Sequence, residues 1–321
     1  MSLNIQEISR DKLSIKTYFD GHEKVYYFSD IETKLEGFIA IHNTNLGPAV
    51  GGTRMRQYFS QEEALSDALL LSKAMSYKCA LAKVPYGGGK AVIIGNPKIK
   101  DESLLRAYGQ MLATLDCSFR TGVDVGMTDE DVKNISQYNT CMIGVLDPTT
   151  DKMHTADMAA LSVFVSIQAS VKKMLGKQPS ETTVAVKGLG KLGSELVRLL
   201  SAEGYRVVAA DIDESRNQKI KELFPNITIV DQEVIHKVSC DIFSPCALGN
   251  ELNEETVNEL NTKIICGGAN NQLSSDSIGI SLHQKNILYC PDYLVNAGGL
   301  INVVDELEND GYKKERVKER V

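Results

Sequence analysis

Residues 182–211 read TTVAVKGLGKLGSELVRLLSAEGYRVVAAD. A β-branched segment is followed by a glycine-rich turn, a helix-forming segment and a second apolar segment, and the stretch ends at an acidic residue. A G-x-G-x-x-G motif that follows a strand, opens a helix and precedes an acidic residue about 20 positions on is the arrangement of a dinucleotide-binding unit. The stretch therefore predicts a Rossmann-type fold for this part of the chain.

The glycines of this motif have different structural roles. Gly188 makes the turn, Gly190 admits a pyrophosphate, and Gly193 lets the helix pack closely on the strand. The carboxylate of Asp211 accepts from a ribose 2′-hydroxyl and repels a 2′-phosphate, which favours NAD over NADP, although Arg216 lies nearby in sequence. The motif and the strand end supply these cofactor-binding candidates: Gly188, Leu189, Gly190, Lys191, Leu192, Gly193, Asp211 and Ile212.

Strand and helix patterns continue to alternate after this unit. Predicted strands at 241–244, 263–266 and 286–290 complete a doubly wound parallel sheet. The loops at 245–249 and 267–272 then fall at its carboxyl edge, where an open α/β sheet binds its ligand. Cys246 lies in the first of these loops and is a further cofactor-binding candidate.

The first half of the chain carries a second glycine-rich stretch, LAKVPYGGGKAVIIG at residues 81–95. Three glycines deliver Lys90 into an apolar strand, either to let something approach the backbone or to supply positive φ angles. An ammonium group in a buried strand is unfavourable unless it is paired or its pKa falls. The alternative is a tight turn from which Lys90 extends to solvent.

Two other polar residues accompany Lys90. Lys78 follows a predicted helix over 64–77 and projects from the edge of its buried face, although a lysine in a last turn also suits the helix dipole. If Lys78 and Lys90 are close, each ammonium disfavours the charge of the other. Asp124 lies where a predicted strand gives way to a loop, which is a common position for a functional carboxylate.

The chain thus predicts an α/β protein with two domains and a cleft between them. The turn-forming residues 147–151 mark the crossing. We expect a substrate-binding and oligomerisation domain at 1–150, an NAD-binding Rossmann domain at 151–295, and a hinge helix with the C-terminal segment bordering the cleft at 296–321. The edge strands of the first domain make a homo-oligomer the expected assembly.

Composition excludes several functional classes. A net charge of −7 argues against a nucleic-acid binder or an anionic-membrane binder. No apolar run approaches the roughly 20 positions that a spanning helix needs. The five histidines show no ligand spacing, so no metal is expected. The seven cysteines are scattered, which predicts reduced thiols and a cytoplasmic protein.

Eight motifs in order resemble the amino-acid dehydrogenases for leucine, phenylalanine, valine and glutamate. They are GPAVGGTRM (47–55), LSKAMSYKCA (71–80), GGGKAVIIG (87–95), TGVDVG (121–126), GLGKLG (188–193), PCALG (245–249), GANNQL (268–273) and PDYLVNAGGLINVVDEL (291–307). The resemblance covers nearly the whole chain. It implies NAD-dependent oxidative deamination of an L-amino acid to a 2-oxo acid and ammonia, and the reverse reductive amination.

The resemblance also implies roles for individual residues. Lys78 binds the substrate α-carboxylate, Lys90 is a general acid/base with a lowered pKa, and Asp124 exchanges protons and holds the amino group. Thr155, Ala247 and Asn270 are expected near the nicotinamide. The full substrate-binding set comprises Lys78, Val50, Gly51, Gly52, Met75, Gly122, Asn270, Asn296, Leu300 and Val303.

The expected substrate has an apolar side chain, branched or aromatic. Glutamate-specific members resemble GPxKGGxR at the first motif, and this chain has Val50 in place of the lysine. Gly122 resembles the phenylalanine type, where the missing methyl group is expected to enlarge the pocket that Leu300 and Val303 also line. One departure is Met158, which stands where the family usually has glycine.

Two other functions remain possible at this stage. A catalytically silent protein that senses NAD or an amino acid would have no need to retain both Lys90 and Asp124. A hydroxy-acid dehydrogenase would need a histidine base beside an arginine, and His154 is the only histidine near the expected cleft.

Overall fold

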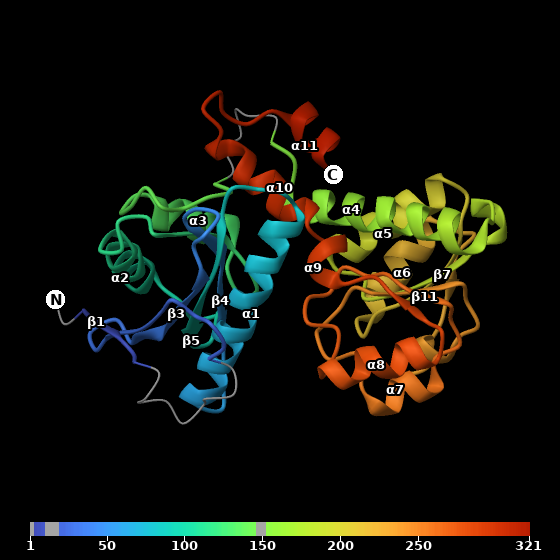
Figure 1. Cartoon of the computed structure of the whole chain (residues 1–321), viewed down its shortest axis with the longest axis horizontal. Coiled ribbons are helices and arrows are strands. Elements are labelled where there is room, and N and C mark those ends of the chain that lie inside the picture. The colour runs from blue at the N-terminus through green and yellow to red at the C-terminus, as the bar shows by residue number, and fades with distance from the viewer. Residues whose placement is uncertain (1–2, 10–18, 146–151) are drawn as a thin grey trace. The chain divides into compact units, whose positions relative to one another are not determined.

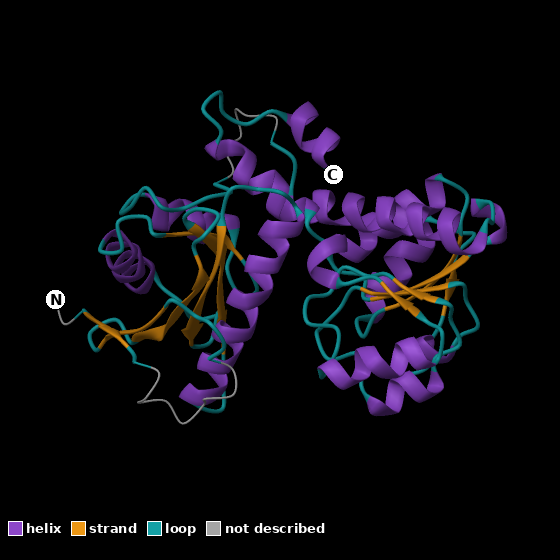
Figure 2. Cartoon of the chain, viewed as in Figure 1, coloured by secondary structure: helices purple, strands orange, loops and turns teal. Residues whose placement is uncertain are grey.

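The structure, a computed structural model, describes residues 3–9, 19–145 and 152–321, and it divides into two compact units (Figure 1). Unit 1 comprises Met1–Lys152 with Val303–Lys313, and unit 2 comprises Met153–Asn302 with Lys314–Val321. Each unit contains a mixed set of helices and strands (Figure 2). The crossing predicted at 147–151 falls entirely within residues 146–151, which lie outside the described ranges.

Unit 1 is built on a six-stranded sheet with the order β1-β2-β3-β5-β4-β6. The first three neighbour pairs in this order are antiparallel, whereas β4 runs parallel to both β5 and β6. The strands are β1 Asn4–Glu7, β2 Lys24–Asp30, β3 Leu35–Asn43, β4 Ala49–Arg56, β5 Gly87–Ile94 and β6 Phe119–Val123.

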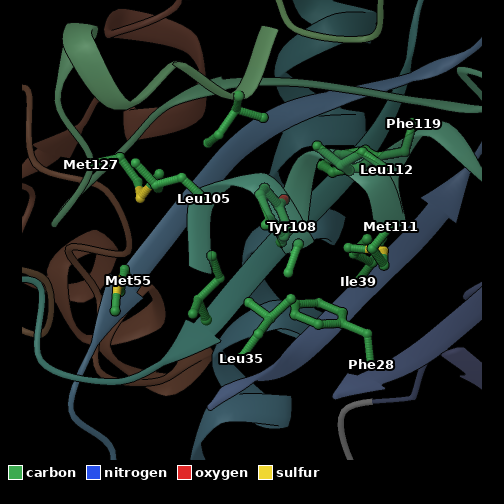
Figure 3. Packing of buried hydrophobic residues seen from close by; sticks show 14 of the residues in the cluster. Phe28, Leu35, Ile39, Met55, Leu105, Tyr108, Met111, Leu112, Phe119 and Met127 are labelled. Carbon is green, nitrogen blue, oxygen red and sulfur yellow. The ribbon is translucent and has the colours of Figure 1, made fainter. Parts of the chain in front are cut away.

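Helices cover both faces of this sheet because successive strand residues point to opposite sides. In β3, Phe38 and Ala40 pack with apolar residues of α1 (Gln61–Leu81). Ile39 and Ile41 pack instead with residues of α2 (Glu102–Ala113) and α3 (Asp129–Ser136). Figure 3 shows this second cluster, in which the Tyr108 ring lies among aliphatic and methionine side chains.

Local sequence fixes the ends of the helices. The Ser60 hydroxyl accepts from the backbone N–H of Glu63 at the start of α1, and the Glu63 carboxylate accepts from the N–H of Phe59. Thr128 and Asp131 form a reciprocal capping box at the start of α3. These caps position α1 and α3 against the strands that carry the candidate site.

The three glycines of the 81–95 stretch lie inside β5, and none of them has a positive φ. The alternative of a tight turn is therefore wrong. An added Cβ would lie 2.0 Å from the carbonyl oxygen of Asn43 at Gly87, 2.2 Å from the backbone nitrogen of Ser76 at Gly88, and 2.6 Å from the Phe119 ring at Gly89. The glycines thus allow neighbouring backbone and side chains to approach the strand closely.

Unit 2 contains a six-stranded, wholly parallel sheet with the order β12-β11-β10-β7-β8-β9. Numbered within the unit, this is the strand order of a classical Rossmann domain, and the prediction of that fold is confirmed. The strands are β7 Thr183–Lys187, β8 Arg206–Ala210, β9 Thr228–Ile229, β10 Ile242–Pro245, β11 Ile264–Ile265 and β12 Leu288–Tyr289.

Helices pack on both faces of this sheet as well. One apolar cluster joins the strands to α4 and α5, and the other joins them to α7 and α8. The helices of the unit are α4 Thr155–Ser170, α5 Lys191–Ala202, α6 Glu214–Leu223, α7 Glu254–Glu259, α8 Asp276–Gln284, α9 Asp292–Val295, α10 Gly298–Val304, which continues into unit 1, and α11 Lys314–Arg320.

Helix α4 requires one correction. It continues through a π-helical turn at Val171–Leu175. Over the described residues, this combined helix of 21 residues with a mean hydropathy of 1.3 is long and apolar enough to cross a membrane by length and composition. The expectation that no run approaches that length is therefore wrong. Its apolar face packs on the sheet of unit 2 through Val163 and Ile167, and a core helix meets the same criteria.

The interpretation of all seven cysteines as reduced thiols is also wrong. Cys117 and Cys141 form a disulfide in unit 1. Cys117 lies in the turn before β6, and Cys141 precedes Met142, which pairs with Thr121 of that strand. The spatial proximity of these two cysteines arises from a strand pairing that their spacing of 24 residues does not reveal. The other five cysteines are free.

Candidate active site

The candidate site of unit 1 is built on two adjacent strands, β4 and β5, and the end of β6. Gly52 of β4 faces the carboxylate that ends β6, because a Cβ on Gly52 would lie 2.8 Å from the Cβ of Asp124. Gly51 faces the other way, and a Cβ there would lie 1.8 Å from the carbonyl oxygen of Gly89. The two glycines therefore admit the Asp124 side chain on one side and strand β5 on the other.

Lys90 and Asp124 form an ion pair between the side-chain nitrogen and Oδ2. The Lys90 side chain is 4% exposed and that of Asp124 is 14% exposed. The chain thus brings together two of its predicted catalytic residues, 34 positions apart in sequence. A buried ammonium is stabilised here by a carboxylate, as the cost of desolvating it requires.

A third charged residue, Arg54, joins this pair. Its Nε lies 3.1 Å from Oδ1 of Asp124, and its Nη1 lies 3.0 Å from Oδ2 of Asp67. The Tyr58 hydroxyl donates to the same Asp67 carboxylate at 2.8 Å. The sequence analysis gave Arg54 no role. Two signals were available: Arg54 is the arginine of the quoted GPxKGGxR motif, and it lies two residues after Gly52, which places both on the same face of β4.

These contacts shift the pKa values of the pair. Burial lowers the pKa of Lys90 below its ordinary value; the Asp124 carboxylate opposes this shift, and the Arg54 guanidinium adds to it. Burial would raise the pKa of Asp124, but the positive charges of Lys90 and Arg54 outweigh it and hold that pKa well below its usual range. Arg54 therefore disfavours the charged form of Lys90. From the sequence, this effect was expected of Lys78.

The end of α1 lies next to the glycine strands. Met75 is partly buried, and its Cγ lies 3.5 Å from the position of a Cβ on Gly51. Lys78, in the last turn of the helix, is partly exposed, and Val50 of β4 is fully buried. Unit 1 therefore gathers Met75, Gly51 and Gly52 beside the Lys90 and Asp124 pair.

The space next to Gly122 gives no support to the expectation that this glycine enlarges the substrate pocket. A Cβ at this position would lie 2.5 Å from the carbonyl oxygen of Ile143. The space that a methyl group would take is thus already filled by backbone of the segment that pairs with β6. Val303 belongs to unit 1, where its Cγ1 lies 3.1 Å from a Cβ on Gly144. Leu300 belongs to unit 2.

In unit 2 the glycine motif forms the turn between β7 and α5. Gly188 has a φ of +100°, and a Cβ there would lie 2.7 Å from the backbone nitrogen of Ala247. A Cβ on Gly193 would lie 1.9 Å from the carbonyl oxygen of Gly188, so this glycine permits the close approach of helix and turn. A Cβ on Gly190, the residue that caps α5, would meet nothing within 4 Å. The open space beside Gly190 at a helix N-terminus fits a pyrophosphate.

Asp211 lies at the end of β8, opposite this turn. Its Oδ2 accepts from the backbone N–H of Leu189 at 2.6 Å, and its Oδ1 accepts from the N–H of Asp213 at 2.9 Å. Arg216 approaches the same carboxylate at 3.4 Å and is half exposed. Ile212 is 82% exposed next to it. The remaining motif residues, Lys191 and Leu192, lie in the first turn of α5.

Loops at the carboxyl edge of the sheet complete the candidate cofactor site. The Asn296 side-chain amide donates to Oδ1 of Asn270 at 2.8 Å and to the carbonyl of Gly268 at 3.1 Å. The Oδ1 of Asn296 is buried and accepts no hydrogen bond within the described protein. The Sγ of Cys246 accepts from the N–H of Gly268. A buried acceptor without a partner fits an amide donor of a bound ligand, such as the nicotinamide carboxamide.

Thr155 begins α4 in the same unit, where its Cγ2 lies 3.0 Å from a Cβ on Gly299. Met158, one turn further, is 2% exposed, and its carbonyl oxygen lies 2.1 Å from a Cβ on Gly298. The glycines of α10 therefore allow close packing against α4. Across residues 3–9, 19–145 and 152–321, no group of three or more His, Cys, Asp or Glu side chains is placed to hold a metal ion.

Comparison with known sequences gives a consistent result. The profile of the Glu/Leu/Phe/Val dehydrogenase dimerisation domain matches residues 22–141, and that of Glutamate/Leucine/Phenylalanine/Valine dehydrogenase matches residues 210–321. The chain is 45% identical over 301 residues to phenylalanine dehydrogenase of Thermoactinomyces intermedius, a match that covers 92% of this chain and 81% of that protein. It is 41% identical over 302 residues to leucine dehydrogenase of Bacillus cereus, covering 94% and 82%.

Solved structures show the same relationship. The crystal structure of L-tryptophan dehydrogenase from Nostoc punctiforme is similar with a TM-score of 0.75 and 41% identity, covering 94% of this chain and 86% of that chain. A hetero-hexameric glutamate dehydrogenase from Thermus thermophilus shares the fold with a TM-score of 0.75 at 20% identity, covering 99% and 80%. The resemblance drawn from the eight motifs and the two-domain α/β prediction are both confirmed.

Proposed function

The chain belongs to the Glu/Leu/Phe/Val dehydrogenase family and is an amino-acid dehydrogenase, and on that premise we propose that it oxidatively deaminates an apolar L-amino acid with NAD. The products are the 2-oxo acid and ammonia, and the reverse reaction is a reductive amination. The main observation behind the proposal is the buried ion pair of Lys90 and Asp124 next to the glycines of β4 and β5.

The residues of unit 1 supply proton transfer and orientation. Lys90, whose pKa is lowered chiefly by burial, takes a proton from the water that attacks the substrate imine. Asp124 stays ionised, holds the substrate amino group and exchanges protons with it. The ammonium of Lys78 pairs with the substrate α-carboxylate. The glycine pair at Gly51 and Gly52 lets strand β5 and the Asp124 side chain approach β4 closely beside this site.

The residues of unit 2 hold the dinucleotide. NAD accepts the hydride of the substrate Cα when it is bound. Gly190 and the N-terminus of α5 would face its pyrophosphate, and Asn296 would accept from its carboxamide. The family resemblance implies that Asn270, Ala247 and Thr155 would lie near the nicotinamide.

We propose NAD in preference to NADP because of Asp211. Its carboxylate is 8% exposed and already bonded to the turn through Leu189, so a 2′-phosphate next to it would place like charges together. Arg216 is a neighbouring cation that favours the alternative.

The substrate proposal rests on the absence of a counter-ion. Val50 is apolar and fully buried, so the carboxylate of a glutamate side chain would gain no partner from it. Relatives named phenylalanine, tryptophan and leucine dehydrogenase at 41–45% identity support an apolar substrate, branched or aromatic. The dimerisation-domain match over residues 22–141 supports a homo-oligomer. The five free cysteines support a cytoplasmic location, while the disulfide of Cys117 and Cys141 counts against it.

The decisive experiment measures NADH formation with a panel of L-amino acids at alkaline pH, and repeats it with NADP. We expect turnover with leucine, valine, phenylalanine or tryptophan, little with glutamate, and a preference for NAD. Binding of NADH without turnover of any amino acid would favour the silent sensor. The variant Lys90→Ala should bind NADH as the parent does and lose turnover, and a near-normal rate would remove Lys90 from its assigned role.

A further inference from the structure

Two cysteines follow adjacent parallel strands of unit 2 at the same level. Strands β11 and β12 pair Ile264 with Leu288 and Ile265 with Tyr289, and the next residue on each strand is a cysteine, Cys266 and Cys290. The backbone N–H of Cys290 donates to the carbonyl of Ile265 at 2.9 Å, so the pairing continues to this point. Neighbouring strands lie about 4.8 Å apart, which is within the Cα separations that disulfides span.

The surroundings of these two thiols differ. Cys266 is fully buried, and its Sγ lies 3.9 Å from the carbonyl oxygen of Val163 in α4. Cys290 is partly exposed, and the Ser170 hydroxyl lies 3.4 Å from its sulfur. Cys290 is therefore the less buried of the two residues, and Cys266 is covered by α4.

Hydrogen bonding makes Cys290 more acidic than Cys266. The contact of Cys290 with the Cys266 thiol, together with that of the Ser170 hydroxyl, lowers the pKa of Cys290 to about 7 in spite of burial. The same contact and burial raise the pKa of Cys266 well above its ordinary value. The other free cysteines of unit 2 differ from Cys290, because burial raises the pKa of Cys240 to about 11 and also raises that of Cys246.

We propose that Cys290 and Cys266 form a reversible oxidation site, in which Cys290 reacts with a hydroperoxide and Cys266 resolves the product into a disulfide. The division follows from geometry, since Cys290 is the less buried residue and Cys266 lies across the strand pair from it in the fully buried position. Thiolate character and accessibility are the properties that select such thiols.

The chemistry balances in two steps. The Cys290 thiolate attacks the peroxide, an S–O bond forms as the O–O bond breaks, and the released alkoxide takes a proton and leaves as an alcohol, or as water from hydrogen peroxide. The Cys266 sulfur then attacks the Cys290 sulfur, so that an S–S bond forms, the S–O bond breaks, and hydroxide leaves with the Cys266 proton as water. Two thiols lose two electrons and the hydroperoxide gains them.

The site is distinct from the residues that we assign to deamination, but it lies at the base of their loops. Cys266 precedes the loop that carries Gly268 and Asn270, and Cys290 precedes α9 and Asn296. Those two loops are already joined by the hydrogen bond between Asn296 and Asn270.

The test uses the full chain, reduced with dithiothreitol, desalted without oxygen, and treated with increasing hydrogen peroxide. Remaining thiols are alkylated and tryptic peptides are analysed by mass spectrometry; Lys263 and Lys285 allow cleavage around each cysteine. We expect a linked peptide pair containing Cys266 and Cys290, with Cys240 still alkylated as the internal control. The linked pair should disappear after addition of a dithiol. Oxidation of Cys240 or Cys246 at the same peroxide concentration, or no linked pair in peroxide excess, would overturn the proposal.

Variants separate the two roles. In Cys266→Ala, Cys290 should persist as a sulfenic acid that dimedone labels, whereas Cys290→Ala should leave Cys266 reduced and unlabelled. Cys240→Ser is the matched control, because it removes a partly exposed thiol of the same unit and should leave the linked pair unchanged. Labelling of Cys266 in Cys290→Ala would contradict the assigned order of attack.

Discussion

The buried ammonium of Lys90 is paired with Asp124, and Asp124 is shared with the guanidinium of Arg54. Asp124 and Arg54 shift the pKa of Lys90 in opposite directions: the carboxylate raises it, while the guanidinium, like burial, lowers it. Lys90 must be neutral to accept a proton during deamination, so the rate of deamination should rise with pH through the pKa of Lys90. The direction in which each neighbour shifts the pKa of Lys90 can therefore be determined from the pH profile of the rate.

Replacing Asp124 with asparagine removes the negative charge that favours the Lys90 ammonium. The pKa of Lys90 should fall further, so that the acid limb of the kcat/KM profile moves to lower pH. Loss of the positioned carboxylate should also lower kcat by about 100-fold or more. An acid limb that moves to higher pH would contradict the pairing.

Replacing Arg54 with methionine removes a positive charge next to the pair. The pKa of Lys90 should rise and the acid limb of kcat/KM should move to higher pH, opposite to the shift in Asp124→Asn. Asp67 also loses its closest cation, and we expect a loss of about 3 kcal/mol in the free energy of unfolding.

Arg56→Met is the matched control for Arg54→Met. Arg56 lies two residues along the same strand and pairs with Glu63, and its side chain is 43% exposed. This variant should keep the parent pH profile. A shift as large as that of Arg54→Met would show that net charge, and not contact with Asp124, moves the profile.

Alanine at Gly122 tests whether this glycine has a packing role. Its Cβ would lie 2.5 Å from the carbonyl oxygen of Ile143, so β6 or its neighbour must move. We expect the free energy of unfolding, measured in denaturant, to fall by about 1–3 kcal/mol. The variant should not simply prefer small substrates where the parent prefers large ones. Gly279→Ala is the control, because its Cβ would meet only Leu273 at 3.5 Å. Unchanged stability with a narrower substrate range would restore the pocket hypothesis.

Alanine at Gly190 separates folding from cofactor binding. The added Cβ would meet no protein atom within 4 Å, so thermal unfolding should be nearly unchanged. The methyl group would occupy space that the pyrophosphate needs, and we expect NADH to bind at least about 10-fold more weakly. Tight NADH binding by a folded Gly190→Ala protein would place the pyrophosphate elsewhere.

The Rossmann half was predictable because its signals are local. The glycine turn, the strands on either side and Asp211 lie within 30 residues, and each is recognisable from residue type and spacing. The two-residue strand β9 was not predicted, although the equally short β11 and β12 were predicted within longer apolar segments. Local patterns likewise identified Lys90 and Asp124 as polar residues at strand positions, and the family resemblance related them to one site.

Contacts between distant strands were the part that could not be predicted. Arg54 reaches Asp124 across 70 residues because β4 and β6 are neighbours in the sheet. The same strand order places Ile143 against Gly122 and brings Cys117 to Cys141. Residue type alone indicates neither the order of strands in a mixed sheet nor which carbonyl fills the space beside a glycine.

The discontinuity of unit 1 affects how the protein can be divided experimentally. Glu306 accepts from the backbone N–H of Gly144 at 2.7 Å and pairs with Lys152 at 2.8 Å, yet it lies more than 150 residues further along the chain. A fragment that ends at Lys152 would lose both contacts and the packing of Val303 beside Gly144. A fragment meant to fold as unit 1 alone therefore has to include residues 303–313, joined to the segment that ends at Lys152.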